Sequence, residues 1–246
     1  MPSVLGMTDD AERTRNFWID RAHTTAGEMA VYTHSRSRRY DAWTRAMLQT
    51  WTLGRVRAAK PRYARCLDLG CGHGDWTEAF ATLADEVFAC DVAPSFVDQT
   101  RRRVPHASVA CADLRSYRMP DRLDLVYVGA VLMHLTFDDA LDVLLRVRNA
   151  ANRDALVIVR DWCTFNLGRR TENPDPRYFS VHRPAHEVRR IAELAGLTCV
   201  ELRSSPSIYG EVMARHACVL QWPLRALWRL STLHWLRASH TLVLRA

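Results

Sequence analysis

Three glycines at alternate positions, Gly70, Gly72 and Gly74, lie between a short apolar run and a segment with helical periodicity. Glycine lets the backbone turn tightly and approach a ligand closely. The helix that follows has unpaired N–H groups at its start, and these attract an anionic group such as a carboxylate. The sequence therefore predicts a ligand-binding turn between a strand and a helix.

Short apolar runs alternate with helix-length segments from this turn to about residue 202. The apolar runs are continuous, as expected for strands that are covered on both faces. Strands and helices that alternate at this spacing are typical of parallel βαβ units. We therefore expect an α/β fold with a Rossmann-like, doubly wound, mostly parallel sheet. The expected strands are 64–69, 86–90, 107–111, 123–128, 155–160, 198–202 and 240–245, and the expected core helices are 75–83, 95–103, 138–149 and 186–195.

The length of 246 residues predicts a single domain with segments attached at both ends. Residues 1–60 are expected to form an N-terminal helical cap, residues 61–204 the Rossmann-like core, and residues 205–246 a helical insertion and a last strand. The tail at 220–236 is rich in Leu and Trp, and two interpretations stay open. It packs on the sheet or on a partner chain in a homodimer, or it lies on a membrane surface. The two cap helices are expected at 9–22 and 37–59.

The composition narrows the range of partners. The net charge is +7, but Lys60 is the only lysine, so the excess is a general arginine bias rather than a phosphate-binding surface, and we expect no nucleic-acid partner. The seven cysteines are odd in number and lack CxxC spacing, which predicts free thiols, no metal site and a reducing cytoplasm. Neither a signal peptide nor a run of about 18 apolar residues is present, so we expect no integral membrane segment.

Two classes of cofactor are bound by a glycine-rich turn of this kind. Dinucleotide binders need GxGxxG, but from Gly70 the third glycine would fall on Asp75. The pattern is instead Asp68-x-Gly70-x-Gly72-x-Gly74, which resembles motif I of the class I S-adenosylmethionine-dependent methyltransferases. The resemblance implies that these four residues bind S-adenosylmethionine.

Two further carboxylates extend the resemblance. Asp91 and Val92 end the second expected strand, and in the family an acid at this place accepts hydrogen bonds from both ribose hydroxyls. Asp113 ends the third strand, where the family's acid binds the adenine amino group and its neighbours line the ring pocket; here those neighbours are Ala112 and Leu114. The resemblance therefore implies a complete adenosyl site at the carboxyl edge of the sheet.

The fourth expected strand and the turn after it, which begins at Gly129, are similar to the family's motif IV. The resemblance covers roughly residues 64–160, with a looser match to residue 202. His73 departs from the family pattern, which favours small or hydroxyl residues between these glycines. Contact with the cofactor carboxylate and exposure to solvent both stay open for this side chain.

The candidate general base is His134, just beyond the fourth strand at the edge where open α/β sheets bind ligands. Neutral histidine accepts a proton near physiological pH. The alternative is a packing residue that bonds to a backbone carbonyl. Tyr32, Asp161 and Tyr178 are candidate substrate contacts. Asp161 could instead ligate a divalent ion or cap a turn, although no metal is predicted.

Three functions stay open. The first is a bacterial, cytoplasmic enzyme that methylates a hydroxyl of a small metabolite, a sugar or polysaccharide precursor, because arginine-rich and lysine-poor composition is similar to that of actinobacterial enzymes of this kind. The second is methylation of an amine in a small molecule, peptide or RNA, although Val128-Gly129-Ala130-Val131 replaces the Asn/Asp-Pro-Pro-Tyr signature of amino-group methylases. The third is a binding module without activity.

Overall fold

The computed structural model describes residues 4–24, 38–162, 170–172, 175–206 and 237–246. Its centre is a seven-stranded sheet in the order β3-β2-β1-β4-β5-β9-β8. Strands β1 to β5 pair in parallel, and β9 lies antiparallel between β5 and β8. The expectation of a mostly parallel, Rossmann-like sheet is confirmed. The strands are β1 (Tyr63–Leu69), β2 (Ala84–Asp91), β3 (Ser108–Cys111), β4 (Leu123–Gly129), β5 (Ala151–Trp162), β8 (Thr198–Pro206) and β9 (Arg237–Arg245).

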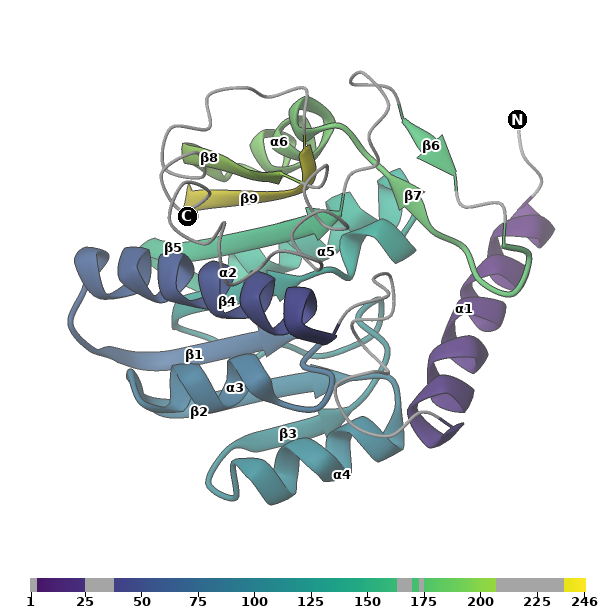
Figure 1. The fold of residues 1–246 in the computed structure, drawn as a ribbon. Helices are drawn as coiled ribbons and strands as arrows, with labels where there is room; N and C mark the ends of the chain where they lie inside the picture. Colours follow the sequence, from purple (N-terminus) through teal and green to yellow (C-terminus); the bar gives the residue numbers. More distant parts are fainter. Residues whose placement is uncertain (1–3, 25–37, 163–169, 173–174, 207–236) are drawn as a thin grey trace.

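Helices cover both faces of this sheet (Figure 1). One face packs against α5 (Phe137–Ala150) and α6 (Ala185–Leu194), and the other against α2 (Arg38–Ala59), α3 (Asp75–Ala81) and α4 (Pro94–Arg103). The central strand residues Val126, Leu125 and Val157 have no exposed surface, which explains why their runs are continuously apolar.

Local signals set the helix boundaries. Thr136 is the N-cap of helix α5, and its side chain accepts a hydrogen bond from the Asp139 N–H. Helix α4 begins with Pro94, whose missing N–H costs nothing at a helix start. Gly196, at φ +80°, follows the end of α6. These boundaries agree with the expected core helices to within about two residues, as is usual for helix ends.

The two N-terminal helices have different positions. Helix α1 (Val4–Thr24) stands at the end of the sheet, beside the short hairpin of β6 (Thr171–Glu172) and β7 (Val181–His182) (Figure 1). Helix α2 packs on a face of the sheet, where Val56 is buried and accepts a hydrogen bond from the Tyr63 hydroxyl. Of the two helices expected in the N-terminal cap, α1 lies beside the end of the sheet and α2 on one of its faces.

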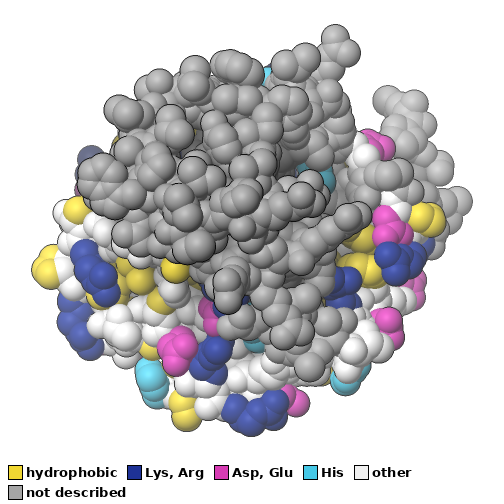
Figure 2. All heavy atoms as spheres, in the orientation of Figure 1, with side chains coloured by type: hydrophobic (Ala, Val, Ile, Leu, Met, Phe, Trp, Pro, Cys, Tyr) yellow, Lys and Arg dark blue, Asp and Glu magenta, His cyan; other side chains and the backbone are white. Residues whose placement is uncertain are grey.

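The tail at 220–236 lies outside the described residues. Among the helices that the structure describes, none has the length and hydrophobicity needed to cross a bilayer. On the face shown in Figure 2, basic and acidic side chains of the described residues are interspersed rather than gathered by sign.

Candidate active site

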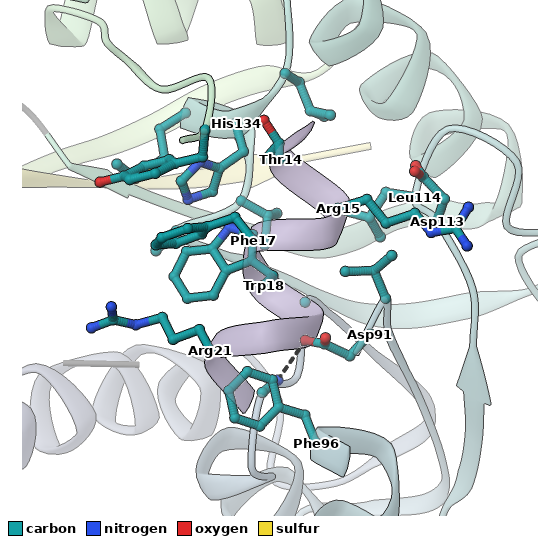
Figure 3. A pocket seen from close by; sticks show the side chains of 18 of the residues that line it. Thr14, Arg15, Phe17, Trp18, Arg21, Asp91, Phe96, Asp113, Leu114 and His134 are labelled. Atoms are coloured by element: carbon teal, nitrogen blue, oxygen red, sulfur yellow. Dashed lines mark hydrogen bonds between the residues drawn. The ribbon is translucent and has the colours of Figure 1, made fainter. Parts of the chain in front are cut away.

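A cavity of about 470 Å³ opens where the parallel strands end, beside α1 (Figure 3). Pockets for cofactors and small molecules usually enclose about 300–1,000 Å³. Seven of the expected cofactor residues line it, and so do two of the other candidates, His134 and Tyr178. The seven cofactor residues are Gly70, Gly72, Asp91, Val92, Asp113, Leu114 and Gly129.

The glycine turn connects β1 to α3 in the left-handed region, with φ of +75° at Gly70 and +89° at Gly74. A Cβ at Gly70 would lie 2.1 Å from Cγ1 of Val131, which lines the cavity beside it. A Cβ at Gly74 would lie 3.0 Å from Oγ1 of Thr100 in α4. Gly70 therefore permits close packing of the turn on Val131 at the cavity wall, whereas Gly74 does not line the cavity and permits close packing of the turn on α4.

Asp91 ends β2 and holds the turn through its carboxylate. Its Oδ2 accepts from the Gly72 N–H at 2.9 Å, and its Oδ1 accepts from the Ala93 N–H at 2.9 Å. Burial raises the pKa of Asp91, although these N–H donors favour the charged form. The carboxylate remains on the cavity wall, where each oxygen has a second lone pair for a ligand hydroxyl.

Asp113 follows β3 and is held by Arg115. Its Oδ1 accepts from Nε of Arg115 at 2.9 Å and its Oδ2 from Nη2 at 2.5 Å. Burial alone would raise the pKa of Asp113, but the hydrogen bonds and charge of Arg115 hold it below its usual value. Leu114 lines the cavity beside it, whereas Ala112 packs on the core behind.

Asp68 and His73 lie behind the cavity rather than on its wall. Oδ2 of Asp68 accepts from the Thr77 hydroxyl at 2.7 Å, and burial raises the pKa of Asp68 to about 7. His73 is 6% exposed, with Nδ1 3.6 Å from Oδ1 of Asp75. It neither faces solvent nor lines the cavity, because Asp75 and Arg103 pack against it.

His134 ends a single 3₁₀ turn, η2 (Leu132–His134), and lines the cavity. Its Nδ1 lies 3.1 Å from the Phe179 carbonyl oxygen. A carbonyl only accepts, so Nδ1 carries the proton and the neutral ring has its basic lone pair on Nε2. The ring also meets the Trp18 ring edge-on, at 5.2 Å between centroids.

The three candidate substrate residues have different positions. Tyr178 lines the cavity and stacks on Phe17, with ring centroids 4.2 Å apart. Asp161 is 1% exposed in β5 and does not line the cavity; its charge acts instead on the buried Arg183. Tyr32 lies outside the described residues.

Comparison with known proteins identifies the family. Residues 66–154 match the family described as a methyltransferase domain. The chain is 27% identical over 162 residues to N-terminal Xaa-Pro-Lys N-methyltransferase 1 of Danio rerio, covering 63% of this chain and 71% of that protein. It is 26% identical over 193 residues to trans-aconitate 2-methyltransferase of Rhizobium etli, covering 74% and 72%. A solved methyltransferase from Leishmania major superposes with a TM-score of 0.69 at 13% identity, covering 95% of this chain and 82% of that one.

Residues 66–154 therefore form a methyltransferase domain, and the fold supports its assignment to the class I S-adenosylmethionine-dependent methyltransferases. The chain is accordingly an enzyme, with S-adenosylmethionine as its methyl donor.

The cavity of this methyltransferase suits that donor. Gly70 presents backbone without a side chain to the cavity, and the carboxylates of Asp91 and Asp113 both face the same cavity. Figure 3 shows Asp113 beside Leu114 and Arg15, with His134 beside Phe17 and Trp18. Within the described ranges, no group of three His, Cys, Asp or Glu side chains is arranged to hold a metal ion.

The methyltransferase also has cavity residues that sequence analysis missed. They come from α1 and share one helix face, at spacings of three, one and three residues: Thr14, Phe17, Trp18 and Arg21. This spacing is visible in the sequence, but it does not distinguish a helix face that lines a cavity from one that packs on a sheet, because both show the same periodicity. Asp175 and Arg177, which pair with each other at 2.6 Å, line the cavity as well.

Proposed function

We propose that this enzyme methylates a hydroxyl group of a small acceptor, with His134 as the general base. Bound S-adenosylmethionine supplies a methyl group made electrophilic by a positively charged sulfur. The observation that carries the proposal is that His134 lines the same cavity as Asp91 and Asp113. The hydrogen bond to the Phe179 carbonyl puts the imidazole proton on Nδ1, so Nε2 is the basic nitrogen.

We assign the cofactor residues from the family resemblance and from their places around the cavity. The turn holds the methionine part through Gly70 and Gly72, with Gly74 supporting it from behind. Asp91 with Val92 accepts the ribose hydroxyls, and Asp113 with Leu114 holds the adenine. Asp68, Ala112 and Gly129 complete the site, the first two by supporting the turn and the strand end from behind.

His134 has the properties that a hydroxyl acceptor needs. An alcohol is a weak nucleophile, so loss of its proton as the new carbon–oxygen bond forms lowers the barrier. The lone pair on Nε2 takes that proton, while the Phe179 carbonyl stabilises the protonated ring through Nδ1. Asp161 supports this region through Arg183 rather than by touching the acceptor.

A small acceptor agrees with the shape of the site. Helix α1 lies over the cavity and contributes Phe17 and Trp18, and the stacked ring of Tyr178 continues the same aromatic wall. Aromatic side chains offer a flat apolar surface with few conformations to lose, which suits one face of a sugar ring. A sugar or polysaccharide precursor is therefore our preferred acceptor.

An amine is the second candidate. The relative from Danio rerio is named as an N-methyltransferase. A base is useful there too, because an ammonium must lose a proton before it attacks. The Rhizobium etli relative is named for trans-aconitate, whose carboxylates need no base. Loss of turnover on substitution of His134 therefore indicates a hydroxyl or amine acceptor, and unchanged turnover indicates a carboxylate acceptor.

The test combines an acceptor panel with a substitution. The purified chain is incubated with methyl-labelled S-adenosylmethionine and with sugars, primary amines, a Pro-Lys peptide or trans-aconitate, and labelled product is counted. With the accepted sugar, His134→Gln should lower kcat by roughly 10²–10⁴-fold, while the Kd of S-adenosylmethionine changes little. His106→Gln, on an exposed loop, is the matched control. Normal turnover of His134→Gln, or labelling of trans-aconitate alone, would contradict the proposal.

A further inference from the structure

Arg183 is a buried cation that contacts the turn carrying His134. Its side chain has no solvent exposure. Its Nη1 donates to the Leu132 carbonyl at 2.8 Å, and its Nη2 donates to the Leu135 carbonyl at 2.6 Å. His134 lies between these two residues in the chain, so one guanidinium holds the backbone on both sides of the proposed base.

The turn needs such support because it is short. Its backbone hydrogen bonds run from the His134 N–H to Val131 at 3.0 Å and from the Leu135 N–H to Leu132 at 3.1 Å. The Leu132 carbonyl thus accepts from both Leu135 and Arg183, whereas the Leu135 carbonyl follows the last hydrogen bond of the turn, where helix ends need partners from outside the helix. A guanidinium presents its N–H groups in a planar fork, which spans two carbonyls in a fixed geometry that a lysine ammonium cannot reproduce.

The charge of Arg183 is compensated on its other side. Its Nε lies 3.2 Å from Oε1 of Glu187. Burial lowers the pKa of Arg183, and the charges of Asp161 and Glu187 oppose that effect. Buried ion pairs commonly add little net stability compared with apolar side chains of similar size. The arrangement is therefore better explained by the geometry it imposes than by the stability it adds.

The same chain segment also fixes the imidazole ring. Phe179, four residues before Arg183, accepts the hydrogen bond from Nδ1 of His134 through its carbonyl. We infer that Arg183 is a positioning residue for His134, because it sets the turn so that Nδ1 meets the Phe179 carbonyl and Nε2 keeps its lone pair. The catalytic value of this arrangement rests on the proposed function, but the arrangement itself is measurable without an acceptor.

The experiment reads the protonated nitrogen of His134 by long-range ¹H–¹⁵N spectroscopy of the full chain with ¹⁵N-labelled histidine. The chain has ten histidines, and His134→Gln assigns the signal by its loss. We expect wild type to show the Nδ1–H form. Arg183→Lys keeps the charge but loses the fork, and the ratio of Nδ1–H to Nε2–H should fall at least about threefold. Arg189→Lys is the matched control, because Arg189 also pairs with a glutamate four residues on, but at the surface.

A folded Arg183→Lys variant with wild-type His134 signals would overturn the inference. If that variant does not fold, Glu187→Gln decides, because it keeps the guanidinium and removes the charge that holds Nε. A shift toward Nε2–H then supports the inference, and unchanged signals overturn it. Normal turnover of His134→Gln with a shifted signal in Arg183→Lys would refute the proposed base and leave the positioning role intact.

Discussion

Asp91→Asn separates cofactor binding from folding. The carboxylate accepts one N–H at each oxygen, at 2.9 Å from Gly72 and from Ala93, and each oxygen has capacity for a ribose hydroxyl. An amide accepts at one position only and is neutral. Hydrogen bonds to charged groups contribute about 1.5–3 kcal/mol each. Loss of one such bond to the ribose should raise the Kd of S-adenosylmethionine by roughly 10- to 150-fold.

Stability should respond differently from affinity. Burial raises the pKa of Asp91, so the ionised carboxylate destabilises the protein without ligand at neutral pH. The neutral amide removes that cost but also loses one accepted backbone hydrogen bond. These two effects oppose each other, so we expect little change in thermal midpoint together with a large loss of affinity.

Titration calorimetry with S-adenosylmethionine measures the affinity, and a thermal melt without ligand measures the stability. Asp85→Asn is the matched control, because Asp85 lies on the same strand but bonds to Arg62 at the surface, at 2.5 Å. A Kd for Asp91→Asn within about threefold of the Asp85→Asn value would refute the assignment of Asp91 to the ribose.

Two further predictions concern the turn. Burial raises the pKa of Asp68 from 3.8 to about 7 despite the Thr77 hydrogen bond. Because the folded protein binds this proton more tightly than the unfolded chain, the free energy of unfolding of the wild type falls as pH rises from about 4 to about 7. In urea unfolding, Asp68→Asn should match wild type near pH 4 and exceed it near pH 8 by up to about 4 kcal/mol; equal stability at both pH values would contradict this. Gly70→Ala places Cβ 2.1 Å from Val131, so it should lower the free energy of unfolding by about 1–3 kcal/mol and weaken cofactor binding. Gly54→Ala, whose Cβ meets nothing within 4 Å in a helix, should instead stabilise by about 1 kcal/mol, and the same sign for both would refute the steric argument.

The core and the cofactor half of the site could be predicted from sequence because their determinants are local. Each expected strand is a continuous apolar run, and each carboxylate or glycine follows its strand directly. Parallel strands bring these ends to one edge, so knowing the fold was enough to bring Gly70, Asp91 and Asp113 together. Sequence could not show that Asp68 and Gly74 lie behind the wall, because that depends on contacts with Thr77 and Thr100.

The acceptor half depends on contacts between distant parts of the chain, and this is why sequence analysis found only part of it. The backbone of Phe179 donates its N–H to the Thr14 hydroxyl of α1 at 2.8 Å, and its carbonyl accepts from His134 at 3.1 Å. These partners are 165 and 45 residues away. A backbone group has no sequence signature, and the buried Arg183 resembles any other arginine before a helix. The cofactor site can thus be predicted from motifs, whereas the position of the proposed base depends on the packing of the loop before β7 between α1 and the turn at His134.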